Sequence, residues 1–332
     1  MKLKLMIIML LVICSIAFGK TKIKFATVAP EGSTWMNVMT EYAAAVKEAT
    51  NGEVSFKIYA GGVAGDEQIV LRKIRVGQLH SAGFTGVGLG EVLPDVRILD
   101  SPFLFRSTEE IDHISSTLFD YFAKKFEEKG FVLLGWAEVG YVYVFTDKPI
   151  YGLEDMSGVK MWMWEGDPIA EATFNSFDIS PIPLSISDVL TSLQTNLIDG
   201  IYVSPLACTA LQWHTKVKYM LNFPLANSNG AVLLSKKQFD KLTEEQQKIL
   251  KDLSFEYLGK LTQLSRQDNV TSLELIKQTG IQFTELKDQD NISSFYKLGE
   301  TARNSLVGKL YDQKLLDQVE NSLKEFRNQQ KN

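Results

Sequence analysis

The feature that most constrains the fold is a proline-free segment that runs from Thr243 to Gly280. Thr243 and Gln246 have the spacing of a capping box, in which both side chains accept hydrogen bonds from free backbone N–H groups. A helix this long is more natural as a strut across two lobes than inside one small domain; two shorter helices broken near Gly259 are the alternative. Apolar residues recur at the spacing of one helical face, namely Ile249, Leu253, Tyr257, Leu261 and Leu264.

Predicted strands and helices alternate before this segment. Residues 22–28 are predicted to form a strand, and residues 54–60 alternate apolar and polar side chains with the period of a half-buried strand. Ser33 and Asp66 stand where they can cap the helices that follow. This alternation is typical of α/β sheets with helices on both faces. It continues in the middle third, where strands are predicted over residues 131–139, 141–146 and 159–164.

The N-terminus predicts export. Lys2 and Lys4 precede an apolar run that ends at Phe18, and Ala17 and Gly19 are small residues at the positions that signal peptidase recognises. The run is shorter than the roughly 20 residues that a membrane-spanning helix needs, so residues 1–19 are expected to be a cleaved signal peptide and the protein periplasmic. Cys14 is not preceded by a small residue, which argues against a lipoprotein.

The exported chain is expected to be mildly acidic. Loss of Lys2 and Lys4 takes the formal net charge from −5 to −7 (−5 − 2), and no basic block predicts nucleic-acid binding. Cys208 is then the remaining cysteine, so no internal disulfide is expected. We expect Cys208 to be a small apolar core residue rather than a nucleophile.

Five segments, in the same order along the chain, resemble signature segments of TRAP-transporter solute receptors. Each is weak alone, but the similarity runs in the right order over nearly all of the exported chain. They are Phe25-Ala26-Thr27-Val28-Ala29-Pro30, residues 61–67, Leu99-Asp100-Ser101-Pro102-Phe103-Leu104-Phe105, residues 152–160 and residues 193–200.

This resemblance implies a periplasmic-binding-protein-like α/β fold with two lobes, crossing hinge strands and a long strut helix. The expected lobe I comprises residues 20–144 plus about 230–270, and lobe II comprises residues 145–229 plus about 271–332. The resemblance also implies a small-molecule solute bound in the cleft between the lobes. The implied partners are integral membrane TRAP permease subunits driven by an ion gradient.

The sequence departs from the family pattern where a ligand carboxylate is usually bound. Members of the family usually carry an arginine in the strand after the Gly-Val-Lys segment, and here Trp162 stands at that position. A second arginine of many acid-sugar binders corresponds to a position near Val142. Without these guanidinium groups, which bind carboxylates through paired hydrogen bonds, we expect a hydrophobic or aromatic-bearing solute.

Strand geometry suggests which residues line the cleft. Lys160, Trp162 and Trp164 project to one face of their strand, and Met161 and Met163 project to the other. Ordinary core packing is the alternative for the two indoles. The aromatic pattern resembles a TRAP subgroup that works with a periplasmic tetratricopeptide-repeat protein. The full set of expected ligand-binding residues is Trp162, Trp164, Val142, Tyr141, Tyr202, Ile186, Glu67, Phe84, Trp35 and Trp136.

Catalytic and metal-binding motifs are weak. His80, His113 and His214 are isolated and lack a partner at metal-ligand spacing, so no metal site and no cofactor are expected. No nucleophile turn or phosphate-binding loop is found, which argues against an enzyme. A binding component of a sensory or chemotaxis pathway, or a receptor that holds a polar organic acid without arginine, remains an alternative function.

Overall fold

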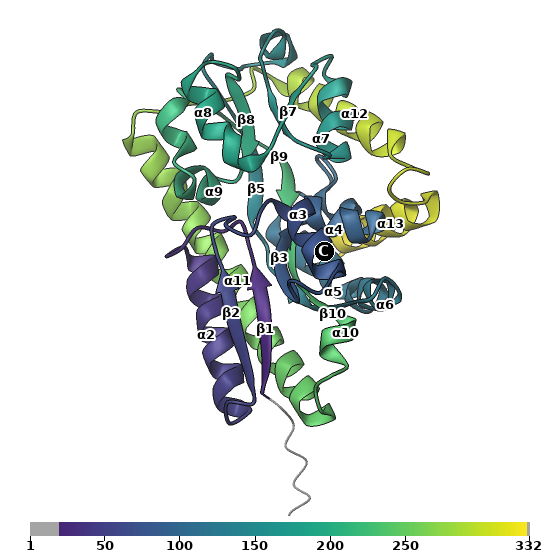
Figure 1. Ribbon diagram of the computed structural model, residues 1–332. Helices are drawn as coiled ribbons and strands as arrows, with labels where there is room; N and C mark the ends of the chain where they lie inside the picture. The colour runs from purple at the N-terminus through teal and green to yellow at the C-terminus, as the bar shows by residue number, and fades with distance from the viewer. Residues whose placement is uncertain (1–19, 331–332) are drawn as a thin grey trace, which may run out of the picture.

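The structure is a computed structural model that describes residues 20–330, so the predicted signal peptide lies outside the described residues. The chain forms two lobes, each built on its own sheet, as Figure 1 shows. The first sheet has the strand order β2-β1-β3-β10-β4 and the second the order β11-β9-β5-β8, with a separate pair β6-β7. The expected α/β architecture is confirmed.

The first lobe is an α/β layer structure with helices on both faces of its sheet. Its strands are β1 (Thr21–Ala26), β2 (Val54–Tyr59), β3 (Ser81–Thr85), β4 (Phe131–Trp136) and β10 (Gly230–Ser235). The helices are α2 (Thr34–Ala49), α3 (Glu67–Arg75), α4 (Gly86–Val92), α5 (Thr108–Thr117), α6 (Phe119–Glu128), α10 (Lys236–Phe239) and the 3-10 helix η1 (Pro94–Asp100).

Period-two alternation in β10 explains the two helical layers. Ala231 and Leu233 face the core under α3 to α6, whereas Val232 and Leu234 face the core under α2. Successive strand residues point to opposite faces, so a strand buried on both sides is apolar throughout. Ser33 and Asp66 cap α2 and α3 as predicted.

The second lobe contains smaller sheets and shorter helices. Its strands are β5 (Gly140–Thr146), β6 (Trp162–Trp164), β7 (Ile182–Leu184), β8 (Gly200–Val203), β9 (Tyr219–Ser228) and β11 (Gln282–Thr284). Its helices are α7 (Pro168–Ser176), α8 (Val189–Gln194), α9 (Pro205–Ala210), α12 (Gln289–Ser305) and the 3-10 helices η2 (Leu153–Met156), η3 (Ile186–Asp188) and η4 (Trp213–Lys216). Cys208 is buried in its core, as expected.

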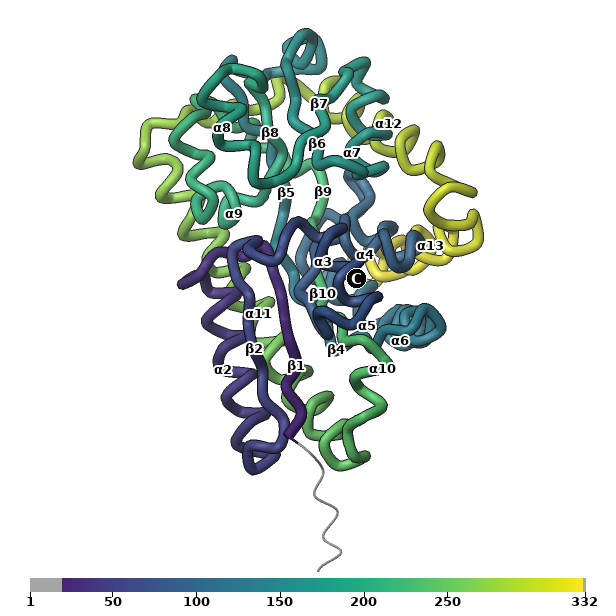
Figure 2. Tube along the Cα trace, in the orientation of Figure 1, coloured from purple at the N-terminus to yellow at the C-terminus, as the bar shows by residue number. Residues whose placement is uncertain are grey.

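Two neighbouring chain segments cross between the lobes. One joins β4 to β5 and the other joins β9 to β10, and they run side by side in Figure 2. Ala137 N donates to Gly230 O at 2.7 Å, and Val139 N donates to Ser228 O at 3.0 Å. The predicted crossing strands are therefore hydrogen-bonded to each other at the cleft.

The proline-free segment forms one helix, α11 (Glu244–Gln278), of 35 residues. Its capping box is present: Thr243 N donates to Gln246 Oε1 at 3.1 Å, and Gln246 N donates to Thr243 Oγ1 at 3.2 Å. The helix continues through Gly259, so the alternative of two shorter helices is wrong. It packs against α2 and β4 in the first lobe and against α9 in the second.

The C-terminal helix α13 (Gln313–Gln329) packs differently from the expected lobe division. Leu315, Leu316 and Val319 belong to the core under α5 of the first lobe, whereas α12 packs against α7 of the second lobe. The expected assignment of residues 271–332 to lobe II therefore does not describe α13, because its apolar face completes the first-lobe core. Across residues 20–330, no helix combines the length and apolarity needed to cross a membrane.

Candidate functional site

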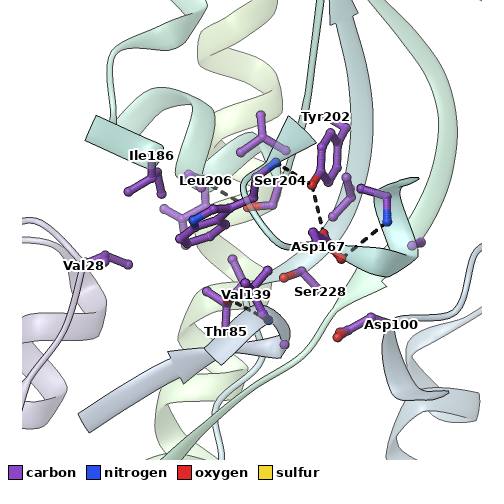
Figure 3. Close-up of a pocket in the computed structure, with 18 of the residues that line it drawn as sticks. Val28, Thr85, Asp100, Val139, Asp167, Ile186, Tyr202, Ser204, Leu206 and Ser228 are labelled. Atoms are coloured by element: carbon purple, nitrogen blue, oxygen red, sulfur yellow. Dashed lines mark hydrogen bonds between the residues drawn. The ribbon is translucent and has the colours of Figure 1, made fainter. Parts of the chain in front are cut away.

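A cavity of about 210 Å³ lies between the two lobes, beside the crossing segments. This is far more than the roughly 10–15 Å³ that one water molecule needs. Figure 3 shows Val28 and Thr85 of the first lobe facing Ile186 and Leu206 of the second across this space, with Val139 between them. Side chains of both lobes therefore meet at one enclosed and mainly apolar site.

Strand β6 places two indoles at the cavity and two methionines away from it. Trp162 and Trp164 line the cavity, whereas Met161 and Met163 lie in the opposite core of the second lobe. The predicted orientation of the strand is therefore the observed one. Its physical basis is the alternation of side chains along an extended backbone.

Trp162 is the centre of an aromatic cluster in the second lobe. Its ring stacks on Tyr202 with 5.2 Å between centroids and meets Trp213 edge-on, also at 5.2 Å. Its indole N–H donates to Leu184 O at 3.1 Å, and the side chain is only 2% exposed. Trp162 therefore lines the cavity and also packs in the core of the second lobe. These two positions were the alternatives predicted from the sequence.

Trp164 connects the two lobes. Its indole N–H donates to Asp66 Oδ2 at 3.1 Å, while Asp66 Oδ1 accepts from the Glu67 backbone N–H at 2.7 Å. One carboxylate therefore caps helix α3 of the first lobe and holds a side chain of the second lobe.

Glu67 forms a buried polar contact in the first-lobe wall. It is 2% exposed and accepts hydrogen bonds from Thr85 N at 2.7 Å, Thr85 Oγ1 at 2.9 Å and Gly88 N at 2.7 Å. Burial raises the pKa of its carboxyl to about 7, although these three donors act in the opposite direction. Glu67 thereby binds the first turn of α4.

Arg97 lies between two carboxylates at the cavity. Its Nη2 is 2.7 Å from Asp167 Oδ1, and its Nε is 3.0 Å from Asp100 Oδ2. Burial acts to lower the pKa of Arg97, but the two carboxylates outweigh it and the pKa is raised. Burial also raises the pKa of Asp100 to about 6. The guanidinium is therefore held charged and already paired.

Asp167 completes this network from the second lobe. It caps helix α7, accepting from Ile169 N at 3.1 Å, and its Oδ2 accepts from the Tyr202 hydroxyl at 3.0 Å (Figure 3). Burial raises the pKa of Tyr202 well above its usual value, so the hydroxyl remains a donor. The pair Arg97–Asp167 is a salt bridge between the lobes.

The structure brings together most of the residues that the sequence suggested. Two of them lie elsewhere: Trp136 packs against Phe119 and Phe122 and donates to Ser115 O, and Tyr141 packs against the first-lobe core. The placement of these two at the site is wrong. The eight that line the cavity are Trp35, Glu67, Phe84, Val142, Trp162, Trp164, Ile186 and Tyr202.

Strand alternation explains the error at Tyr141. Val142 lines the cavity, so its neighbours in β5 point to the other face. Trp136 lies at the end of β4, within reach of α6 rather than of the second lobe. Lys160 is also outside the cavity, because its ammonium group contacts Asn196 O and lies 3.6 Å from Asp199 Oδ2.

The cavity residues that the sequence analysis missed include the charged residues Arg97, Asp100 and Asp167 and the aromatic residue Trp213. Asp167 was recognisable only as the residue before the Pro168 that opens a helix. Arg97 and Asp167 are 70 residues apart in the chain, and no local pattern signals that they pair. Among the described cavity residues Arg97 is the one cation, against the three carboxylates of Glu67, Asp100 and Asp167.

Comparison with known proteins agrees with this architecture. Residues 25–306 match the family model of bacterial extracellular solute-binding proteins, family 7. The chain belongs to this family. The two-lobed fold and the interlobe cavity are those of a receptor that binds a small solute, of the TRAP periplasmic type.

Individual relatives are distant. The chain is 25% identical over 264 residues to the 2,3-diketo-L-gulonate-binding periplasmic protein YiaO of Escherichia coli, covering 79% of this chain and 80% of that protein. A solute-binding protein of Chromohalobacter salexigens is 28% identical over 164 residues, and the match spans about half of each chain, 49% and 48%.

A solved structure gives the same fold. The TRAP periplasmic solute-binding protein of Pseudomonas putida F1 with bound D-glucuronate is 26% identical and superimposes with a TM-score of 0.79, covering 86% of this chain and 94% of that one. Its ligand is a sugar acid.

Proposed function

We propose that this protein is the periplasmic receptor of a TRAP-type transporter and that it captures a small, uncharged, hydrophobic or aromatic-bearing solute. The observation that carries the proposal is the cavity wall of Trp162, Trp164, Trp213 and Tyr202. Flat aromatic rings offer a large apolar area at fixed positions, with few polar atoms to satisfy.

Electrostatics supports an uncharged solute. If all four charged side chains of the cavity are ionised, their sum is −2 (+1 − 3), and it is −1 (+1 − 2) when Glu67 keeps its proton. The guanidinium that could attract a carboxylate is held by Asp100 and Asp167. A ligand carboxylate would therefore be buried without a free cation, and an unpaired buried charge is strongly unfavourable.

The eight cavity residues that the sequence suggested are proposed to contact the solute, together with Trp213. Their positions divide between the lobes, so a bound solute would be enclosed by both, and we propose that the cleft opens and closes about the crossing segments. Binding that contacts both lobes favours the closed state. Integral membrane TRAP permease subunits are the proposed recipients, and a periplasmic tetratricopeptide-repeat protein is a further proposed partner.

The proposed function is tested with a panel of solutes of matched size. Titration calorimetry with 3-phenylpropanamide, an uncharged aromatic compound, is expected to give binding, whereas D-glucuronate and D-galacturonate give none. Native mass spectrometry of the purified protein is expected to detect an apolar co-purified ligand.

A variant pair locates the binding in the cavity. Trp164→Ala is expected to weaken binding of the amide by about 10-fold or more, since burial of an aromatic ring contributes on the order of 2 kcal/mol. Trp136→Ala removes an indole that lies outside the cavity and leaves binding unchanged. Tight binding of D-glucuronate by the unaltered protein would contradict the proposal.

A further inference from the structure

We infer that Asp167 is a specificity-determining residue that stands in for a ligand carboxylate: it occupies the guanidinium of Arg97 and so excludes acidic solutes from the cleft. This inference rests on the proposed function, since it explains how a receptor of this fold selects uncharged solutes. Three observations carry it: the geometry of the pair, its position across the cleft and the charge balance of the cavity.

The geometry is that of a bound carboxylate. Arg97 Nη2 donates to Asp167 Oδ1 at 2.7 Å, which is the short distance of a charge-assisted hydrogen bond. The other oxygen, Oδ2, accepts from the Tyr202 hydroxyl at 3.0 Å. A cation and a hydroxyl thus hold the two oxygens of one carboxylate inside an apolar cavity, as a receptor would hold the acid group of a ligand.

The position of the pair strengthens this interpretation. Arg97 belongs to η1 of the first lobe and Asp167 caps α7 of the second, so the bond joins the two lobes across the cleft. Both side chains line the cavity and both are buried, with 3% of Arg97 and 5% of Asp167 exposed. The protein thereby supplies from its own chain an interlobe ion pair that an acidic ligand could otherwise complete.

The charge balance explains why a ligand cannot simply join the pair. Arg97 already faces Asp100 and Asp167, so one positive charge is shared by two carboxylates. A third carboxylate would be repelled by both, and it would have to approach Arg97 beside the oxygen that Nη2 already binds and the Asp100 oxygen that lies 3.0 Å from Nε. An acidic solute must therefore displace Asp167, which is itself fixed by backbone bonds from Ile169 and Ala170.

The first test is chemical rescue by formate, the smallest carboxylate. Asp167→Ser shortens the side chain and leaves a gap beside Arg97, while serine still caps α7. Formate is expected to raise the melting temperature of this variant saturably, compared with chloride at equal ionic strength. The unaltered protein and Asp167→Asn, whose amide fills the gap, show no such rise.

The second test compares 3-phenylpropanoate with 3-phenylpropanamide by titration calorimetry. The Asp167→Ser variant is expected to bind the carboxylate at least about 10-fold more tightly than the unaltered protein does, because a charged hydrogen bond to Arg97 becomes available. Adding Arg97→Gln to this variant removes the gain.

The outcomes separate this inference from the proposed function. If Asp167→Ser is folded but shows neither a formate-specific rise nor tighter binding of the carboxylate, Asp167 does not act as a stand-in. An equal formate effect in Asp167→Asn also overturns the inference, because it places the anion elsewhere. If the unaltered protein binds no uncharged probe, the proposed function loses its support, while the formate experiment still decides the role of Asp167.

Discussion

The two walls of the cavity differ in chemistry. The first-lobe wall contains three charged side chains, Glu67, Arg97 and Asp100, each bonded to other protein atoms, beside the rings of Trp35 and Phe84. The second-lobe wall contains one charged side chain, Asp167, beside the rings of Trp162 and Tyr202. Charged groups that are satisfied within the protein fix the shape of the site but leave little to offer a ligand. The rings of the second-lobe wall pack on one another, and Trp162 is only 2% exposed. Under the proposed function, the charged groups fix the shape of the site and the aromatic rings contribute affinity.

Truncation in the second-lobe wall gives the largest expected effect. Trp162→Ala removes a ring that packs on Tyr202 and Trp213, and the cavity left behind is expected to lower the free energy of unfolding by about 3–5 kcal/mol. The folded variant also binds 3-phenylpropanamide more weakly. Urea denaturation and titration calorimetry measure the two losses.

The control is Met161→Ala in the neighbouring position of the same strand segment. Met161 faces the opposite core, so its truncation costs about 2–5 kcal/mol of stability but leaves binding by the folded protein unchanged. If folded Trp162→Ala bound the amide as tightly as the unaltered protein, affinity would not reside in the second-lobe wall.

Glu67 of the first-lobe wall is expected to make the free energy of unfolding depend on pH. Burial raises the pKa of Glu67 from 4.5 to about 7, so the folded protein keeps a proton that the unfolded chain releases. The unfolded chain binds fewer protons over this interval, and stability therefore falls as the pH rises from about 5 to about 7. The loss that Glu67 causes is about 3 kcal/mol.

Glu67→Gln removes this contribution, so its unfolding free energy is expected to fall less between about pH 5 and about pH 8. Urea denaturation at several pH values measures the slope. Glu91→Gln, at an exposed carboxyl, is the matched control and retains the slope of the unaltered protein. Equal slopes in all three proteins would show that Glu67 is ionised throughout.

The smallest expected effect concerns a hydrogen bond within the second-lobe wall, between Tyr202 and Asp167. Tyr202→Phe keeps the ring stacked on Trp162 but removes the hydroxyl that donates to Asp167. The hydroxyl also accepts a long bond of 3.4 Å from Trp164 N, and loss of the two bonds is expected to lower the free energy of unfolding by about 1–2 kcal/mol. Thermal denaturation measures it, and a loss as large as that of Trp162→Ala would show that the polar network, not ring packing, stabilises this wall.

Local rules predicted much of the fold from the sequence. Capping residues and periodicity gave the ends of α2, α3 and α11, because these features depend on neighbours within one helical turn. Strand alternation likewise oriented Trp162 and Met161. The same rule applies to β5: because Val142 faces the cavity, its neighbour Tyr141 is expected to face away from it.

Features that depend on distant contacts could not be predicted in this way. The partner of Arg97 follows 70 residues later, on the other lobe, and no spacing rule connects them. The docking of α13 against α5 depends on the first-lobe core, nearly 200 positions earlier in the chain by rough count, rather than on the helix that precedes it. Such pairings need the tertiary structure.

Helix α11 provides a single backbone amide at which the proposed opening of the cleft can be followed. Its Asn269 donates to Val139 O at 2.8 Å in one crossing segment, and its Oδ1 accepts from the Leu206 N–H at 3.0 Å in α9 of the second lobe. The side-chain amide of Asn269 thus binds the crossing segment and the second lobe to the same turn of α11. If the proposed opening moves α9 away from this turn of α11, the Leu206 amide is released, and its deuterium uptake would then report the opening.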